Sequence, residues 1–302
     1  MNRDRITFAY CVLALCVSWA LQYAALALVG DPESAAATPW LLAAMATPGL
    51  LALAFMIASP GTRGQVLWRP TLRGLMLVPA AVLVPTFIAF AGVAIIVALG
   101  WGHSRWFEFA RDGVTISRGP WLLGLGQQRW PWFSVNVALT GAAYALISAI
   151  PACGEEFGWR GFLQGRLIER FGLRRGIVVL GTIWAFWHLP AQAAGYNFPD
   201  HPLLGAFVLS PIELAATSFF LAWLTLRARG FWPAALAHGA GNSIQAGVTG
   251  SLQLDVPRIY GHVVTLALTL AVGCLCLLLL ESRRRSDLPA GRKPRALDPH
   301  PA

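Results

Sequence analysis

Long apolar stretches separated by short polar segments dominate the sequence. Eight of them are long enough to cross the ~30 Å of bilayer hydrocarbon as helices. They cover roughly residues 6–29, 39–58, 73–100, 133–153, 176–195, 203–226, 231–249 and 259–280. We therefore predict an all-α fold, a polytopic transmembrane helical bundle of about eight spans that occupies residues 1–282 as a single domain.

The composition supports this prediction. The chain has 302 residues, of which 56% are hydrophobic and 12% charged, and its mean hydropathy is +0.58. A soluble domain carries about twice that charged fraction. We therefore expect an integral, multi-pass membrane protein whose partners include the lipid bilayer. The apolar run from Ile6 to about Val29 is too long for the hydrophobic region of a signal peptide, which predicts a retained first span.

Arginines set the expected orientation, because cytoplasmic loops are rich in Lys and Arg. They gather before the first span, in alternate loops and after the last span (Arg3, Arg5, Arg63, Arg69, Arg73, Arg160, Arg166, Arg170, Arg174, Arg175, Arg227, Arg229 and Arg283 to Arg285). We predict that both termini are cytoplasmic and that residues 283–302 form a basic, disordered cytoplasmic tail. The same clustering explains the net charge of +9 without a nucleic-acid partner. The arginine bias and the short loops favour a bacterial inner membrane.

Residues 101–132 depart from this pattern. They should lie outside, yet they contain four arginines and five tryptophans (Arg105, Arg111, Arg118, Arg129; Trp101, Trp106, Trp121, Trp130, Trp132). Tryptophan is enriched at membrane interfaces. We predict an aromatic, partly helical segment that lies at the outer interface.

The first candidate for chemistry is the pair of adjacent carboxylates Glu155 and Glu156 at the end of the fourth apolar stretch. If the helix continues past Pro151, Glu156 and Arg160 lie at i, i+4 and face one another. Glu155, about 100° around the helix, then has no obligatory cationic partner and is the better general base. The open alternative is that both glutamates are solvated at the start of a loop.

Two further polar pairs with helical spacing lie inside apolar segments. His188, one turn after Trp184, falls ~18 Å along its span at 1.5 Å per residue, which is near the middle of the membrane. His238 and Asn242 share one helix face, and Gly239 and Gly241 between them permit close approach of another helix or of a substrate. Each pair has a structural alternative as polar contacts between helices. Glu155, His188 and His238 are expected in the cytoplasmic half of adjacent spans, where they can converge on one cavity.

These motifs resemble the CAAX-prenyl-protease and bacteriocin-processing family (CPBP, also called Abi) of intramembrane endopeptidases. The family patterns E-E-x-x-x-R, F-x-x-x-H and H-x-x-x-N appear here in order as Glu155-Glu156-x-x-x-Arg160, Trp184-x-x-x-His188 and His238-x-x-x-Asn242. The resemblance covers about residues 130–250, which we take as the catalytic core. The one departure is Trp184, where the family usually has Phe.

The resemblance implies roles for these residues in the hydrolysis of a peptide bond near the cytoplasmic side. Glu155 is the expected general base on water and His188 the residue that orients this water. His238 and Asn242 are expected to stabilise the oxyanion, while Glu156 and Arg160 brace the site. The substrate is expected to be a membrane-associated peptide or protein.

Metal dependence stays open at this point. Glu155, His188 and His238 could supply three ligands of a catalytic zinc with water in the fourth position. Glu and His can also activate water without metal, and we favour this glutamic-type chemistry over a zinc metalloprotease. No cofactor is certain. The five cysteines lie in or beside apolar segments without a CxxC pattern, so we predict neither a disulfide framework nor a cysteine metal site.

Two other functions remain as alternatives. A non-catalytic membrane scaffold or bacteriocin self-immunity protein would use the same cavity for binding. A secondary transporter could use Glu and His as a proton relay, but no inverted repeat is visible. Glu213 is a further acid inside a span. We expect it to line the substrate path, to pair with a histidine across the bundle, or to be neutral and hydrogen-bonded at the Pro211 kink, rather than to act in catalysis.

Overall fold

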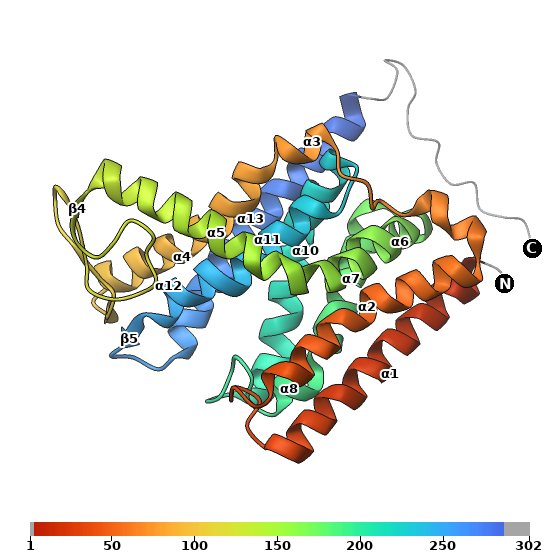
Figure 1. Cartoon of the computed structure of the whole chain (residues 1–302), viewed down its shortest axis with the longest axis horizontal. Helices are drawn as coiled ribbons and strands as arrows, with labels where there is room; N and C mark the ends of the chain where they lie inside the picture. The colour runs from red at the N-terminus through yellow and green to blue at the C-terminus, as the bar shows by residue number, and fades with distance from the viewer. Residues whose placement is uncertain (1–2, 287–302) are drawn as a thin grey trace, which may run out of the picture.

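The computed structural model describes residues 3–286 and is helical throughout its membrane part (Figure 1). The long helices are α1 (Arg3–Val29), α2 (Thr38–Ala58), α4 (Val78–Ala98), α5 (Trp130–Glu156), α7 (Leu173–Trp187), α10 (Ser210–Ala228), α11 (Trp232–Ala240) and α13 (Ile259–Ser286). Shorter helices are α3 (Leu72–Leu75), α6 (Gln164–Phe171), α8 (Leu189–Ala193), α9 (Pro202–Leu204) and α12 (Ala246–Gly250). A 3₁₀ helix covers Pro60–Gln65, and π-helical turns cover η2 (Phe157–Leu163), η3 (Gly205–Leu209) and η4 (Gly241–Gln245).

The predicted all-α, polytopic bundle is confirmed. Within the described residues, 6 helical segments are long and apolar enough to cross a membrane: Arg3–Val29, Thr38–Ala58, Leu72–Ala98, Trp130–Phe171, Pro202–Ala228 and Ile259–Ser282. The Trp130–Phe171 segment joins α5, η2 and α6 into 42 continuous residues, so the fourth span does not end at residue 153 as predicted. The count of eight spans and the cytoplasmic termini stay predictions.

The other two predicted spans are helical but interrupted. In the span predicted at 176–195, α7 ends at Trp187, and α8 begins beyond His188 with Pro190 in its first turn. In the span predicted at 231–249, α11 passes into the π turn η4 before α12. The first interruption falls at His188, and the second follows His238 and contains Asn242. A helix break inside a membrane protein is tolerated where neighbouring side chains satisfy the freed backbone groups.

Glycines let the bundle pack tightly around the end of α5. A Cβ on Gly154 would lie 2.8 Å from the Met45 carbonyl oxygen of α2, and one on Gly158 would lie 2.4 Å from the Tyr10 hydroxyl of α1. On the other side, a Cβ on Gly239 of α11 would lie 2.5 Å from the Ala149 nitrogen of α5. The expected close helix approach at Gly239 is therefore present. These contacts hold α1, α2 and α11 against the same part of α5.

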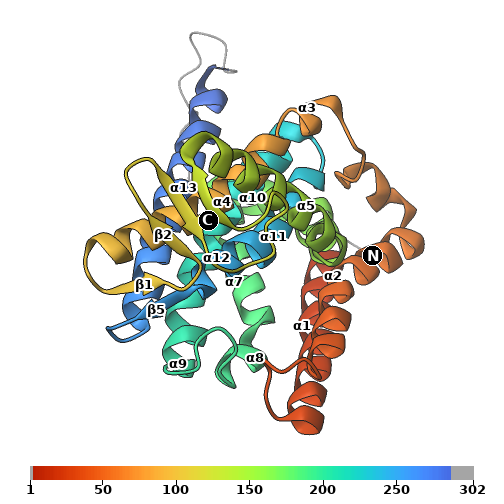
Figure 2. The same cartoon turned by 60° about the vertical axis from the view of Figure 1, so that its left-hand side comes forward.

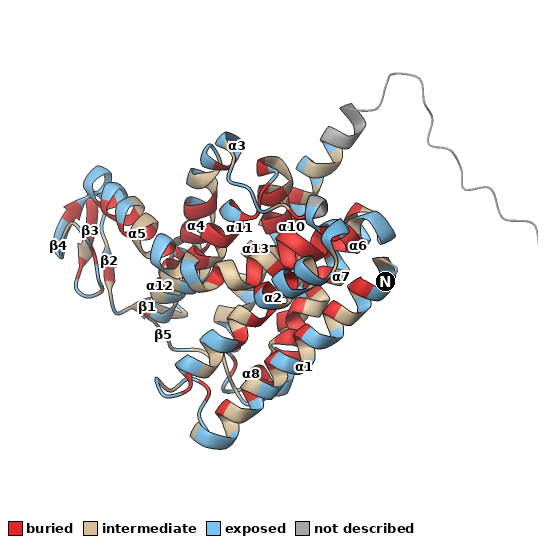
Figure 3. Ribbon diagram, turned by 45° about the vertical axis from the view of Figure 1, so that its right-hand side comes forward, coloured by how far each residue is buried: buried red, intermediate tan, exposed pale blue. Residues whose placement is uncertain are grey.

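The outer faces of the bundle are apolar. Large side chains such as Phe8 (72% exposed) and Ile150 (75% exposed) point away from the protein, whereas buried residues concentrate on the inner helices, including α10 and α11 (Figure 3). In water such a surface would aggregate. Around a membrane bundle it is the surface that contacts lipid.

Residues 101–132 fold into strands, so the prediction of a partly helical segment is wrong. β2 (Phe107–Phe109), β3 (Gly113–Ile116) and β4 (Gly126–Arg129) form an antiparallel sheet, and β1 (Gly102–Ser104) pairs with β5 (Leu252–Leu254) (Figure 2). Successive side chains on a strand point to opposite faces of the sheet. In β2, Phe107 is buried and the next residue, Glu108, is exposed. Phe107 packs on Phe90 of α4 and on Trp121, with ring centroids 5.2 and 5.3 Å apart. The aromatic residues therefore form the core of a small β-sheet module instead of a helix.

The C-terminal helix α13 continues to Ser286, beyond the predicted start of the tail at residue 283. The predicted disordered tail otherwise falls on 287–302, which lies outside the described residues. The cysteines are all free, as expected.

Candidate active site

Glu155 and Glu156 are the last two residues of α5, and both are buried, with 1% and 0% of their surface exposed. The helix continues through Pro151 and passes directly into η2, where the Phe157 N–H donates to the Cys153 carbonyl. The alternative of two solvated glutamates at the start of a loop is therefore wrong. π turns interrupt α-helices frequently at functional sites, and this one follows immediately after the two acids.

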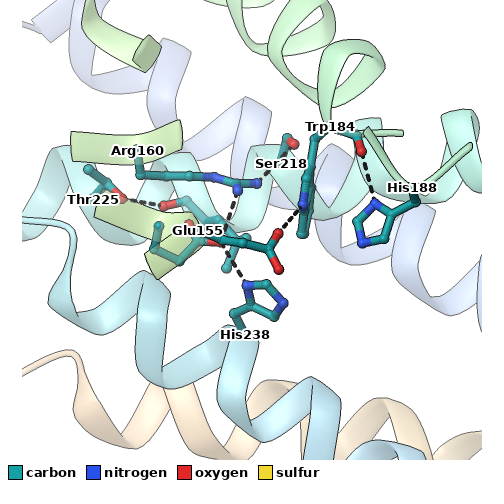
Figure 4. Close-up of polar contacts among 9 residues, drawn as sticks. Glu155, Arg160, Trp184, His188, Ser218, Thr225 and His238 are labelled. Atoms are coloured by element: carbon teal, nitrogen blue, oxygen red, sulfur yellow. Dashed lines mark hydrogen bonds and ion pairs between the residues drawn. The ribbon is translucent and has the colours of Figure 1, made fainter. Parts of the chain in front are cut away.

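Glu156 is the centre of a fully buried ion-pair network. Arg160 Nη1 donates to Glu156 Oε1 at 2.9 Å, as the i, i+4 spacing predicts. His238 Nδ1 lies 2.8 Å from the same oxygen. The Arg160 Nη2 donates to Ser218 Oγ of α10 at 3.1 Å (Figure 4). One carboxylate thus ties η2 to α11, while its arginine ties η2 to α10.

Glu155 has a different environment. Its Oε2 accepts a hydrogen bond of 2.6 Å from Trp184 Nε1, and the Arg160 guanidinium lies over the Trp184 ring at 4.3 Å. Figure 4 shows the Glu155 carboxylate at the Nε1 edge of the indole ring. Glu155 lines the large internal cavity, whereas Glu156 and Arg160 are fully buried behind it. The two adjacent acids are separated as the spacing predicts, one paired and one facing the cavity.

The hydrogen bonds of the histidines fix which ring nitrogen carries a proton. His188 Nδ1 lies 2.9 Å from the Trp184 carbonyl oxygen. A carbonyl only accepts, so Nδ1 must be the N–H, and in the neutral ring Nε2 keeps its lone pair. His238 Nδ1 donates in the same way to Glu156. Both rings line the cavity and both contact the Trp184 ring, with centroids 5.8 and 5.3 Å from it.

Asn242 lies apart from this network. It is in η4, is exposed, and faces the same cavity, but within the described residues it makes no side-chain hydrogen bond to the acids or the histidines. Gly241 beside it also lines the cavity, and a Cβ there would meet only the Gln245 side chain at 4.0 Å. The structure thus joins Glu155, Glu156, Arg160, His188 and His238 through Trp184 and places Asn242 on the wall of the same cavity.

The cavity has a volume of about 1200 Å³ and is lined by residues of most spans. It extends from Glu155 to the segments that follow α1, α8 and β5, which include Glu33, Asn197 and Arg258. This end lies opposite α3 and the C-terminal end of α13 in Figure 1. It is larger than typical small-molecule pockets and is of a size for a peptide segment.

Tyr196 lines this outer part of the cavity. Burial raises the pKa of the Tyr196 phenol, and the carboxylates of Glu33 and Glu155 raise this pKa further. The phenol therefore keeps its proton and can donate a hydrogen bond to a molecule in the cavity.

Two residues of the site were missed by the sequence analysis. Gln22 of α1 spans the break between α7 and α8: its Nε2 donates to the Trp187 carbonyl at 2.8 Å, and its Oε1 accepts from the Ala191 N–H at 3.2 Å. A buried glutamine in the first apolar run was a signal that could have been used. Ser218, the partner of Arg160, carries no such signal because serine is common in membrane helices.

The residues present do not form a metal site. Across residues 3–286, no group of three His, Cys, Asp or Glu side chains has an arrangement that could hold a metal ion. Glu155, His188 and His238 are therefore neighbours without being a ready set of zinc ligands, and no step of the reaction proposed below passes through a metal.

The fold and the site together define a polytopic, all-α membrane protein with a buried Glu–His–Arg centre on an internal cavity. Comparison with family models identifies the class: residues 134–244 match the family described as Type II CAAX prenyl endopeptidase Rce1-like. Residues 134–244 are therefore similar to this family of CAAX prenyl endopeptidases, in agreement with the resemblance seen in the motifs. The match includes all six candidate residues. No curated protein matches the sequence.

Proposed function

We propose that this protein is a glutamic-type intramembrane endopeptidase that cleaves a membrane-associated peptide or protein with water activated by Glu155 and His188. The observation that carries the proposal is the separation of the two acids. Glu156 Oε1 is bonded to both Arg160 and His238, while Glu155 faces the cavity and, within residues 3–286, is hydrogen-bonded only to the Trp184 indole N–H. A carboxylate that is held in place without a cationic partner at its own oxygens is suited to take a proton from water.

In the proposed reaction, water in the cavity gives its proton to Glu155 and attacks the scissile carbonyl carbon. His188 accepts a hydrogen bond from this water at Nε2, because its Nδ1 donates to the Trp184 carbonyl. His238 pairs with Glu156 as an imidazolium, so it carries a proton on both ring nitrogens. Its Nε2–H and the Asn242 amide donate to the oxyanion that forms. The oxyanion then re-forms the carbonyl as the scissile C–N bond breaks, and Glu155 returns the proton to the nitrogen of the leaving amine.

Glu156 and Arg160 act as positioning residues in this scheme. Both side chains are buried and do not line the cavity, and Glu156 accepts a hydrogen bond from His238 Nδ1–H. A carboxylate bonded to one ring nitrogen fixes the ring orientation and directs the other nitrogen to the cavity.

The side of the membrane on which cleavage occurs is a prediction that rests on the distribution of arginines. Our expectation from sequence is the cytoplasmic side. The lining of the cavity favours a different route of entry, because it reaches the arginine-poor loops that contain Glu33, Asn197 and Arg258. We propose that substrate segments enter the bundle from that end and reach Glu155 near the middle of the bundle.

The proposal is tested with purified protein in proteoliposomes, by mass spectrometry of peptides released from a membrane extract. Glu155→Gln and His188→Ala are each expected to reduce release by ~10²–10⁴-fold, the usual contribution of general acid–base catalysis. Glu108→Gln, the same chemical change on the exposed face of β2, is the matched control and should leave release unchanged.

Release at the wild-type rate by Glu155→Gln would contradict the proposal. If cells that carry Glu155→Ala keep a bacteriocin-resistance phenotype of the wild type, the protein acts as the scaffold or immunity protein of the alternative reading.

A further inference from the structure

The wall of the cavity carries a second acid that the proposed reaction does not use. Glu213 lies in the first turn of α10 and lines the cavity. The other two cavity glutamates have partners: Glu33 Oε1 accepts from the Asn197 N–H at 3.1 Å, and Glu155 accepts from Trp184. Within residues 3–286, Glu213 has no hydrogen bond or ion pair.

Hydroxyl groups flank Glu213 on the same helix face. Ser210 and Thr217 lie three residues before and four residues after it, which places all three side chains on one side of α10, and all three line the cavity. Ser210 is 2% exposed, and its Oγ has no partner among the described residues. A buried hydroxyl without a hydrogen bond is unusual in a folded protein. The side-chain oxygens of Ser210 and Glu213 can therefore accept hydrogen bonds from a donor in the cavity.

This face of α10 is close to the reacting centre. Arg160 bonds Ser218, five residues after Glu213, which is about 7.5 Å along the helix axis at 1.5 Å per residue. A Cβ on Gly181 of α7 would lie 2.5 Å from the Ala215 Cα, so α7 and α10 touch at this level. Trp184, the partner of Glu155, follows Gly181 by less than one turn. An extended peptide rises about 3.3 Å per residue, so Glu213 is within roughly three residues of a bond held at Glu155.

The cations of the cavity are occupied elsewhere. Arg105 and Arg258 lie in the outer loops; Arg105 Nη2 donates to the Gly250 carbonyl at 3.1 Å, and Arg258 Nε lies 3.7 Å from Asp200. Neither arginine pairs with Glu213, and a bound ligand can supply the missing cation. An ammonium fits best, because it brings three N–H donors, one for the carboxylate and others for a hydroxyl on either side.

We propose that Ser210, Glu213 and Thr217 form a substrate subsite for a primary ammonium, a lysine side chain or a free amino terminus, within about three residues of the scissile bond. The inference rests on the proposed endopeptidase function and adds the substrate class to it. Glu213 is thus a specificity residue: it binds substrate and takes no part in proton transfer.

The test uses a series of quenched fluorescent decapeptides, prenylated and unprenylated, each with a single lysine at a different position. Acetyl-lysine replaces lysine in a parallel series, and a free or acetylated amino terminus separates the two sources of ammonium. With the wild type in proteoliposomes, lysine at one position or a free terminus near the bond should raise kcat/KM by about 10- to 100-fold over the acetylated form, as for a hydrogen bond to a charged group. Glu213→Gln should remove this preference, Glu213→Lys should replace it by a preference for Glu, and Glu108→Gln should keep it.

Fluorescence anisotropy measures binding of the same peptides to the Glu155→Gln variant. Because this variant is expected not to cleave, the result does not depend on turnover. Tighter binding of the ammonium peptides that disappears in Glu155→Gln/Glu213→Gln supports the subsite even without cleavage. Equal binding of charged and acetylated peptides, or a preference that survives Glu213→Gln, overturns it. Absence of cleavage with a retained binding preference contradicts the proposed function alone.

Discussion

Arg160→Met removes the positive charge at the centre of the site while it keeps a side chain of similar length against the Trp184 ring. Arg160 and Glu156 are both 0% exposed, and the guanidinium donates to Glu156 at 2.9 Å and to Ser218 at 3.1 Å. Loss of one partner of a buried pair leaves an uncompensated charge and costs about 3–5 kcal/mol. Because His238 still donates to Glu156, we expect the lower end, about 3 kcal/mol of unfolding free energy.

The double variant Arg160→Met/Glu156→Gln separates charge from packing. Glutamine keeps an acceptor for His238 Nδ1 but has no charge, so most of the lost stability should return, with about 1 kcal/mol missing for the bond to Ser218. Thermal unfolding in detergent, followed by tryptophan fluorescence, should show the single variant lower by about 6 °C and the double variant by about 2 °C, at roughly 2 °C per kcal/mol for a chain of this size.

Arg170→Met is the matched control. Arg170 pairs with Asp4 at 2.5 Å, but the two side chains are 50% and 62% exposed, so its loss should cost about 1 kcal/mol or less. If the double variant at Arg160 and Glu156 is as unstable as the single variant, the cost does not come from an unpaired carboxylate and the reasoning is refuted.

Three further outcomes follow from the site and its packing. Trp184→Phe removes the 2.6 Å hydrogen bond to Glu155 and keeps the ring; kcat should fall about 10- to 100-fold with KM nearly unchanged, and an unchanged kcat would show that the indole does not orient the acid. Gly158→Ala, whose Cβ would lie 2.4 Å from a hydroxyl oxygen, should destabilise by about 1–3 kcal/mol, whereas Gly165→Ala in open space should stabilise slightly in thermal unfolding. In a cysteine-free background, Gln253→Cys should react with an impermeant maleimide added outside intact cells; protection there would reverse the predicted orientation.

The local parts of the site were predictable from the sequence, since helical spacing alone pairs residues four apart. The contact of Glu156 with Arg160 followed from that spacing and is confirmed. Gly239 was expected to allow close helix approach, and it packs on α5. Contacts between distant segments did not follow. That Glu156 also binds His238, 82 residues later, depends on how α11 packs on α5, and no pattern of residues encodes that packing directly.

The failures have a common physical cause. The fourth span was predicted to end near residue 153, but helical structure continues to Phe171 because the buried Glu156 is paired with Arg160. Residues 101–132 were predicted, from their tryptophans, to be an aromatic, partly helical segment at the interface. Tryptophan packs equally well beneath a small sheet, and Phe107 and Trp121 do so here. Composition indicates where a segment lies, whereas its backbone conformation depends on what it packs against.

The continuous helical segment Trp130–Phe171 has a mechanical consequence. Its 42 residues extend about 63 Å at 1.5 Å per residue, roughly twice the hydrocarbon thickness of a bilayer. A helical segment longer than the bilayer is accommodated by tilt, by a kink or by local thickening of the surrounding lipid. Pro151 lies inside α5 and the π turn η2 follows α5, and both are features at which helices kink. A change in lipid thickness would therefore bear on the stretch of helix that contains the two glutamates.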